Sequence, residues 1–245
     1  GTVTGVQTCA LPIWETGRFN TKLGRLAMGN YTRDGLQIDD IRTEGLEIEN
    51  VSGTTKIESQ DVRAARLRTE AVTLKNLRSA PLTIRDSKNG LSIFTELLQS
   101  DSGSIGTFGL GRVFARNVDI FDRGGVTEIN AAELATESFK TEGLDFGNVS
   151  AMGLKIIDTP SQLFATPSKL TLGRFDTDVI VLGEMNLNGV RFAITQKKIE
   201  MSADDVEAGP GYIPANSIFA RGGDVSGVRF TKPKLVVLPE IGRAH

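Results

Sequence analysis

The residues of this chain that could carry out chemistry are few, and most of them are carboxylates. The 245 residues include one Cys and one His, Cys9 and His245, near opposite ends. A catalytic triad, a Cys–His pair or a zinc site of the His/Cys type would have to be built from these two. Acid–base chemistry by paired carboxylates, as in polysaccharide hydrolases and lyases, is the remaining route. The candidate pairs are Asp39 and Asp40, Asp119 and Asp122, and Asp204 and Asp205.

The spacing of these acidic pairs argues against a catalytic site. Neighbouring side chains in a strand point to opposite faces, so Asp39/Asp40 and Asp204/Asp205 converge only if a corner separates them. The Gly-rich segment GTFGLG at residues 106–111 matches neither a P-loop nor a dinucleotide-binding fingerprint. We therefore predict a non-enzymatic protein without catalytic, metal-binding or cofactor-binding residues.

Both ends of the chain resemble translated sequencing adapters. Residues 3–13, VTGVQTCALPI, are similar to the translation of a common short-read adapter, and residues 241–245, IGRAH, to the opposite adapter. We interpret residues 1–13 and 241–245 as adapter-derived scars, which contain the only Cys and the only His. The native part, residues 14–240, is then a single domain of a longer polypeptide, whose signal or anchor would lie outside it.

The balance of charge and hydrophobicity excludes two broad classes of protein. The chain has 28 Lys and Arg against 30 Asp and Glu, a formal net charge of −2, and 39% hydrophobic residues. Apolar residues never run uninterrupted over the roughly 18 positions of a membrane-spanning helix, and no block of like charge indicates a nucleic-acid partner. Some basic residues lie between apolar ones and predict an outward face that is either solvated or contacts an anionic partner: Arg63, Arg66, Arg68, Lys75 and Arg78.

Large aliphatic side chains recur every five residues along the chain. The first run is Leu36, Ile41, Leu46 and Val51. A second apolar or small residue often follows two positions later, which is the alternation of a strand and not the period of a helix. Because an odd step would send the next pair to the opposite face, the chain must turn or bend about every five residues. The pattern predicts an all-β, elongated repeat stack, which is either a β-helix (β-solenoid) or an open β-groove.

The residue before each of these aliphatic side chains is suited to a corner. Asn, Asp and Gly tolerate left-handed backbone angles, and the side chains of Asn and Asp can bond their own backbone. The predicted corner residues are Asp40, Asn50, Asp61, Asn76, Asn117, Asn148, Gly35, Gly45, Gly143, Gly153 and Gly189.

Two longer copies indicate a repeat architecture. TEGLEIENVSG at residues 43–53 returns as TEGLDFGNVSA at 141–151, with seven of eleven positions identical, and NGVRF at 188–192 returns as SGVRF at 226–230. Self-similarity of this kind is typical of proteins in which each unit packs against its neighbours.

The five-residue spacing is interrupted near residues 88–111 and 158–167, where we place soft breaks within the single domain. In the first stretch Phe94, Leu97 and Leu98 have a helical spacing among Gly and Ser. This indicates either a short helix or a loop folded over the stack.

Two resemblances to known families follow from these patterns. The segments DDIRT, QDVRA, KNLRS and GNVSA resemble the unit of pentapeptide-repeat β-helices, although larger residues replace the small residue that this family has. Residues 182–209 and 223–240, which contain NGVRF, SGVRF and KPKLVV, resemble stretches of AsmA-like and TamB-like bacterial envelope proteins. This second resemblance implies a long apolar groove for phospholipid and a location in the cell envelope or periplasm.

The last apolar run is the candidate for such a groove, because both positions of most pairs have large side chains. Its residues are Leu170, Leu172, Phe175, Ile180, Leu182, Met185, Leu187, Val190 and Phe192. A better-filled closed core is the other interpretation of the same residues.

We therefore expect a structural or binding segment of a larger envelope-associated protein, and the AsmA-like resemblance implies lipid transfer with phospholipid or other envelope components as partners. Two alternatives stay open: a polysaccharide-binding or polysaccharide-cleaving β-helix, and a passive adhesin or filament rod. A stack that is cut at both ends is also expected to associate end to end through its unpaired strands.

Overall fold

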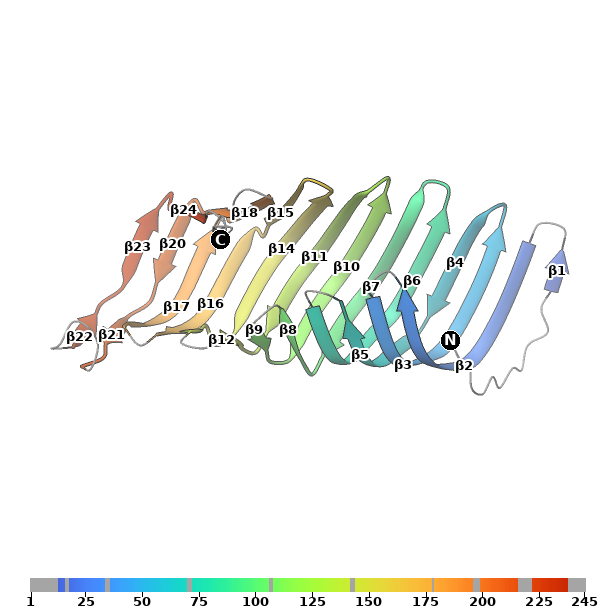
Figure 1. Ribbon diagram of the computed structural model, residues 1–245, viewed down its shortest axis with the longest axis horizontal. Helices are drawn as coiled ribbons and strands as arrows, with labels where there is room; N and C mark the ends of the chain where they lie inside the picture. Colours follow the sequence, from blue (N-terminus) through green and yellow to red (C-terminus); the bar gives the residue numbers. More distant parts are fainter. Residues whose placement is uncertain are drawn as a thin grey trace, which may run out of the picture.

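The chain forms one extensive antiparallel sheet. A computed structural model describes residues 13–15, 18–33, 36–69, 72–105, 108–141, 144–177, 179–195, 199–215 and 222–237. All regular structure in these residues is β-strand, and the strands lie side by side along the long axis of the molecule (Figure 1). The prediction of an all-β chain is confirmed.

The described residues form 24 strands in this sheet. The longer strands, of eleven or sixteen residues, are β2 (Arg18–Arg33), β3 (Leu36–Val51), β6 (Val72–Ser87), β7 (Gly90–Ser100), β10 (Val113–Arg123), β11 (Val126–Thr136) and β14 (Val149–Thr159). The shorter strands are β1 (Ile13–Glu15), β4 (Thr54–Ser59), β5 (Asp61–Arg68), β8 (Ser102–Ile105), β9 (Phe108–Leu110), β12 (Phe139–Thr141), β13 (Leu144–Asp145), β15 (Gln162–Thr166), β16 (Lys169–Asp176), β17 (Val181–Asn188), β18 (Arg191–Thr195), β19 (Ile199–Ser202), β20 (Asp205–Ala208), β21 (Gly211–Ile213), β22 (Gly223–Val225), β23 (Val228–Thr231) and β24 (Lys234–Val237).

Successive strands pair as a long series of hairpins. β2 pairs with β3 along its whole length, and β3 then pairs with both β4 and β5, which share the next crossing of the sheet. β6 pairs with β4 and β5 along one edge and with β7 and β8 along the other. Because each crossing lies against the next one in sequence, the sheet grows in one direction from the N-terminal to the C-terminal strands (Figure 1).

The strand register reveals a repeat of 36 residues, which is two crossings of the sheet. Ile48, Ile84, Ile120 and Ile156 lie on one line across β3, β6, β10 and β14, and each number exceeds the one before by 36. The structural unit is therefore one hairpin.

The longer sequence copies do not follow this period. Thr43 lies in the middle of β3, whereas Thr141, the first residue of the second copy, is the last residue of β12. The two members of the shorter copy also occupy different positions across the sheet. Phe192 pairs with Ala165, in line with Ile156, whereas Phe230 pairs with Val206, in line with Leu187. The interpretation of these copies as equivalent units is wrong.

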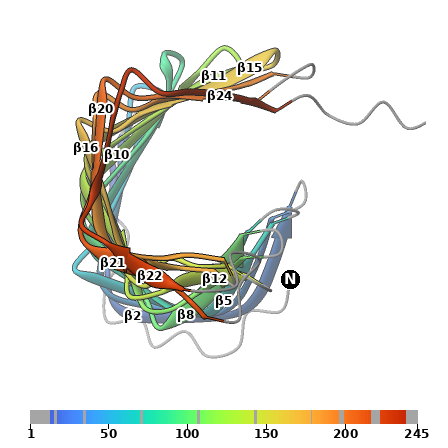
Figure 2. The same ribbon diagram turned by 90° about the vertical axis from the view of Figure 1, so that its left-hand side faces the viewer.

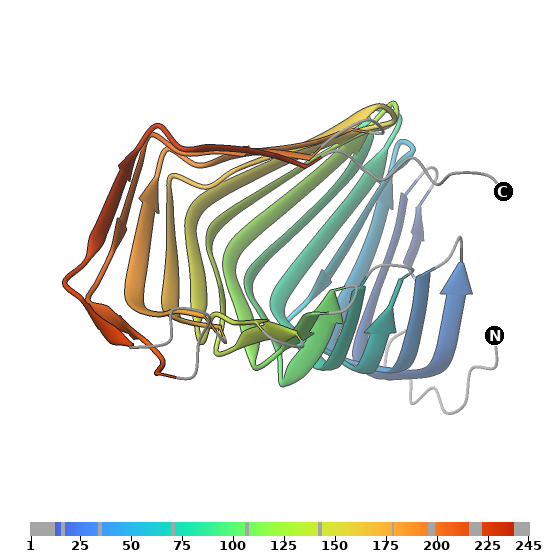
Figure 3. The same cartoon turned by 60° about the vertical axis from the view of Figure 1, so that its left-hand side comes forward.

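Each crossing of the sheet bends, so that the sheet follows an arc when it is seen along its long axis (Figure 2). The bends line up from strand to strand (Figure 3). Six predicted corner residues have the left-handed φ that such bends use: Asp40 (50°), Gly45 (60°), Asn76 (52°), Asn117 (49°), Gly153 (55°) and Gly189 (61°). The corner prediction is confirmed at these positions. The first two corners lie five residues apart on β3, and this distance is the origin of the five-residue spacing.

Ser and Thr side chains support bends on other strands, and sequence reasoning missed them. They are the side chains of Ser59, Thr95, Ser100 and Thr136, and all four are buried. Each hydroxyl donates to the carbonyl oxygen two residues later, over 2.8–3.1 Å: Ser59 to Asp61, Thr95 to Leu97, Ser100 to Ser102, and Thr136 to Ser138. A carbonyl that the bend turns away from the neighbouring strand is thereby satisfied.

Three of the predicted corner residues do not have the expected left-handed φ. Asn50, Asp61 and Asn148 lack a positive φ, and Gly147, one residue before Asn148, has one instead at 60°. The predicted corners Gly35 and Gly143 lie outside the described residues.

The described residues of the first soft break are mostly strand, in β7, β8 and β9, and none of them is helical. Phe94, Leu97 and Leu98 belong to β7, which is paired with β6 on one side and β10 on the other. Backbone pairing on both edges prevails over the helical spacing of three side chains. The second stretch, 158–167, contains the turn between β14 and β15. Of the two adapter-like ends, only Ile13 lies within the described residues.

The most deeply buried apolar residues gather at the bends. Ala115 and Val118 flank the corner at Asn117 and pack together with Ala131 and Leu154, so their side chains point into the inside of the bend. Among the described residues only Val190 and Ser100 are less than 2% exposed. This is few for a sheet of such size, because no described helix or second sheet covers the inside of the arc.

The left-handed corners predict a residue-specific effect on stability. Asn117→Val should lower the free energy of unfolding by about 1–2 kcal/mol, because a β-branched residue is strained at this φ. Asn117→Gly should cost little, since Gly adopts this φ freely. Chemical denaturation followed by circular dichroism measures both. Glu96→Val, on β7 opposite the corner and without a positive φ, is the matched control, and an equal loss in that variant would contradict the explanation.

The unpaired sheet edges predict association of the chain. In the described residues β1 covers only Arg18–Asn20 of β2, and β23 and β24 at the other end each pair on one side. Exposed backbone N–H and C=O groups favour pairing with another chain. Sedimentation velocity over a range of concentrations should show concentration-dependent association, and a strictly monomeric profile would rule it out.

Candidate functional site

One face of the sheet carries most of the apolar side chains. Directly paired residues of antiparallel strands point to the same face, so a line can be followed from strand to strand. The central line contains Leu26, Thr43, Val62, Ser79, Leu98, Ala115, Leu134, Ala151, Leu170, Leu187, Val206 and Phe230. Because Ala115 points into a bend, we call this the inner face and the opposite one the outer face.

A second line on the inner face, which we call the isoleucine row, contains seven isoleucines. They are Ile48, Ile57, Ile84, Ile93, Ile120, Ile129 and Ile156, and the line continues through Ala165, Phe192, Met201 and Leu235. All seven isoleucines are half-buried. Sequence reasoning missed this row, although Ile recurs at alternating steps of 9 and 27, which add up to the 36-residue repeat.

A run of phenylalanine rings crosses the short strands β9 and β12 and reaches β16. The rings of Phe108 and Phe139 stack, with centroids 4.6 Å apart and an interplanar angle of 9°. Phe146 lies 5.8 Å from Phe139 and 5.4 Å from Phe175, in tilted contacts. Such ring pairs contribute more than their buried area alone. They extend an apolar surface over β9, β12 and β16.

Six of the nine predicted groove residues pack in one cluster on the inner face. Leu187 and Val190 form its centre together with Ala203 and Val206. Around them pack Leu170, Leu172, Met185 and Phe192. Burial of the central residues is deep, with Val190 only 1% exposed.

The other three predicted groove residues lie outside this cluster. Phe175 pairs with Leu182 across β16 and β17 and belongs to the run of phenylalanine rings. Ile180 lies in the turn before β17, where its carbonyl accepts a bond from the backbone N–H of Thr177 over 3.1 Å.

The three candidate carboxylate pairs are each divided between different partners or faces. Asp39 lies 3.8 Å from Arg66, whereas Asp40 is the corner residue. Asp119 and Asp122 are three residues apart in β10, which alternation places on opposite faces.

The last pair is separated by its ion pairs. Asp204 lies 3.8 Å from Arg191, while Asp205 accepts a hydrogen bond from Nε of Arg229 over 3.1 Å. Among the described residues, no group of three or more His, Cys, Asp or Glu side chains could hold a metal ion.

The outer face has a line of three directly paired arginines, which we call the arginine row. Arg42 lies opposite Arg63, and Arg63 lies opposite Arg78, on β3, β5 and β6. The carboxylate of Asp61 bridges the last two: each Nε donates to one of its oxygens over 2.7 Å. The Asp61 side chain is only 11% exposed, whereas the side chains of Arg63 and Arg78 are partly open to water.

The bridge lowers the pKa of the Asp61 carboxyl. Burial works against the charged form, but the hydrogen bonds from Arg78 and Arg63 and their positive charges outweigh it. The Asp61 carboxyl therefore stays ionised to a lower pH than an ordinary Asp, and in this form it holds the two arginine side chains side by side.

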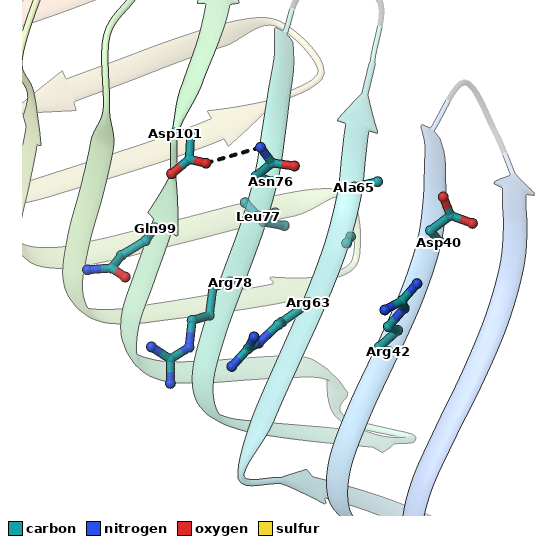
Figure 4. Close-up of a pocket in the computed structure, with 10 residues that line it drawn as sticks. Asp40, Arg42, Arg63, Ala65, Asn76, Leu77, Arg78, Gln99 and Asp101 are labelled. Carbon is teal, nitrogen blue, oxygen red and sulfur yellow. Dashed lines mark hydrogen bonds between the residues drawn. The ribbon is translucent and has the colours of Figure 1, made fainter.

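The arginine row borders a cavity of about 420 Å³, next to the bends at Asp40 and Asn76. Asp40, Asn76 and Asp101 lie on its other side, as Figure 4 shows, and Asn76 donates a hydrogen bond to Asp101 over 3.0 Å. The sequence pattern indicated Arg63 and Arg78 as part of an outward basic face. It did not indicate that Arg42 joins them, because only the register places the three residues in one line.

Comparison with known protein families, curated proteins and solved structures finds no match to this chain. Within the described residues, no helix is long and apolar enough to cross a membrane.

The Asp61 bridge predicts a pH-dependent contribution to stability. The pKa of the Asp61 carboxyl is lowered on folding. The stabilisation by the bridge is therefore fully present above the ordinary Asp pKa near 4, and it is lost as the pH falls through the lower pKa of the folded state. Asp61→Asn should therefore lower the free energy of unfolding at pH 7 by about 1–2 kcal/mol, and the difference should shrink below about pH 4. Urea denaturation at several pH values measures this.

Glu137→Gln is the matched control for Asp61→Asn. Glu137 lies 3.5 Å from Arg112 with both side chains mostly exposed, so solvent screens the pair and the stability should hardly change. A pH-independent loss in Asp61→Asn would contradict the assigned role of the bridge.

Proposed function

We propose that this chain is a non-enzymatic binding segment of a larger envelope-associated protein, in which the curved sheet is an open β-groove for the apolar part of a lipid. The observation that carries this proposal is the continuous row of seven isoleucines on the inner face, which runs parallel to the mostly apolar central line across the sheet. The AsmA-like resemblance of the C-terminal third points in the same direction.

The half-burial of the isoleucine row supports a ligand on the inner face. Apolar side chains that remain partly in water cost free energy in proportion to their exposed area. Soluble proteins rarely expose a contiguous apolar surface of this kind unless something binds to it. An acyl chain is a suitable occupant, because it is apolar along its length and can follow a line of Ile side chains that offers no hydrogen bonds.

Two features of the inner face bear on the polysaccharide alternative. Asp86, Asp122 and Asp158 are exposed acids beside the isoleucine row, in the line that also contains Leu91 and Thr127. A sugar-binding surface would combine such acids with stacking aromatic rings, whereas the neighbouring row here is aliphatic. A lipid is thus favoured over a polysaccharide.

Site-specific photo-cross-linking tests the proposal. A photoreactive phenylalanine analogue is placed at Ile93 or Ile120 on the inner face, in the full chain mixed with vesicles of phosphatidylethanolamine and phosphatidylglycerol. The matched controls are Phe94 and Phe121, the next residues along the same strands, which point to the outer face. Irradiation followed by mass spectrometry should give phospholipid adducts several-fold more often at the inner positions.

A second measurement separates lipid binding from a passive rod. Ligands that bind only the folded state raise its melting temperature, so addition of phospholipid should stabilise the chain. Equal labelling of the inner and outer positions would contradict the groove. No labelling at all in a chain that is folded by circular dichroism would favour a rod or scaffold.

A further inference from the structure

The arginine row concentrates positive charge on the outer face. Arg42, Arg63 and Arg78 are direct neighbours across three strands, and the line continues into the uncharged Ala27 and Gln99. The Cβ atoms of such neighbours lie about 4.5–5.5 Å apart, and like charges at this distance destabilise a sheet.

Asp61 compensates only part of this charge. It bonds the Nε atoms of Arg63 and Arg78, and the terminal nitrogens of these two side chains have no hydrogen bond to any described residue. Arg42 has no acidic partner in the described chain. The nearby Glu44 is engaged elsewhere, since its carboxylate lies 3.6 Å from Arg25. Within the row, the one negative charge of Asp61 bridges two of the three positive charges.

The cavity of about 420 Å³ beside the row is large enough for a small anionic group. Ala64 and Leu77 contribute to its lining, and Gln99 adds an amide next to Arg78. Figure 4 shows the side chains of Arg63 and Arg78 side by side on neighbouring strands. Because Asp61 holds both through Nε, it acts as a positioning residue that leaves the outer donors of each guanidinium available.

We propose that this cavity binds a single phosphate group, carried by either a small phosphoester or a lipid headgroup. Guanidinium groups present two parallel N–H donors that match phosphate oxygens, and Arg42, Arg63 and Arg78 supply three such forks. The proposed site lies on the outer face and does not depend on what binds the inner face.

The acids across the cavity restrict the ligand. Asp40 and Asp101 lie on the side away from the arginine row and repel any further anionic group of the ligand. A lone phosphate is therefore favoured over a polyanion such as heparin or nucleic acid. Replacement of an acid and replacement of an arginine should consequently have opposite effects on phosphate affinity.

Two binding measurements on the full chain test the site and identify its source of phosphate. Isothermal titration calorimetry measures the binding of glycerol 3-phosphate to the chain. Flotation compares vesicles of phosphatidylglycerol with vesicles of a galactolipid that has no phosphate. Arg42→Gln should weaken binding about tenfold or more, while Asp40→Asn should tighten it. Binding should weaken as salt is added, because the partners are partly exposed charges.

Arg116→Gln is the matched control. Arg116 is an outer-face arginine on β10 that lies 3.6 Å from Glu133, away from the cavity, and its loss should leave binding unchanged. Arg42→Gln removes no ion pair within the described chain, so circular dichroism and the melting temperature should match those of the unchanged protein.

The outcomes distinguish the two sources and can overturn the site. Arg42-dependent binding of glycerol 3-phosphate identifies a small phosphoester, and Arg42-dependent binding to phosphatidylglycerol vesicles alone identifies a lipid headgroup. Binding of neither, binding that Arg42→Gln leaves unchanged, or tighter binding of heparin than of a single phosphate would overturn the proposal. None of these results depends on cross-linking at the inner face.

Discussion

The bend in each crossing is the constraint on which the rest of this structure depends. A single-layer sheet has two faces and only one apolar set of side chains to bury, so it must curl toward that set in the absence of a second layer. Left-handed residues such as Asn117 turn the backbone at little cost. Buried hydroxyls such as that of Thr95 satisfy carbonyls at bends on other strands. Buried clusters form at such corners, one around Ala115 and Val118 and one around Leu187 and Val190.

The bends also separate the chemistry of the two faces. Side chains alternate within each straight stretch, and the corners return the apolar set to the same face, so that Ile93 and Ile120 collect inside whereas Arg63 and Arg116 collect outside. The outer face is then held by ion pairs between neighbouring strands, most of them solvent-exposed and individually weak. The Asp61 bridge differs because its carboxylate is shielded, and it organises an arginine row whose charge it does not balance.

The 36-residue hairpin makes the molecule extendable. Each crossing contacts mainly the crossings before and after it, so stability accumulates along one axis as it does in repeat proteins. Equivalent positions in successive hairpins differ in size and polarity: at steps of 36 residues, Thr43 and Ser79 are followed by Ala115, Ala151 and Leu187. A mostly apolar inner face and an outer face with local charge clusters are compatible with two separate ligands, one apolar and one anionic.

The sequence by itself determined the all-β class, the five-residue spacing and six of the corners, because these depend on local preferences of Asn, Asp and Gly and on strand alternation. It could not determine the 36-residue repeat or the isoleucine row, since both depend on which strands pair and in what register. The longer sequence copies pointed to the wrong unit for the same reason. Local spacing also suggested a helix or loop near Phe94, where pairing on both edges makes a strand. The arginine row shows the limit most clearly: Arg42, Arg63 and Arg78 are 21 and 15 residues apart, and only the tertiary structure sets their side chains next to one another around Asp61.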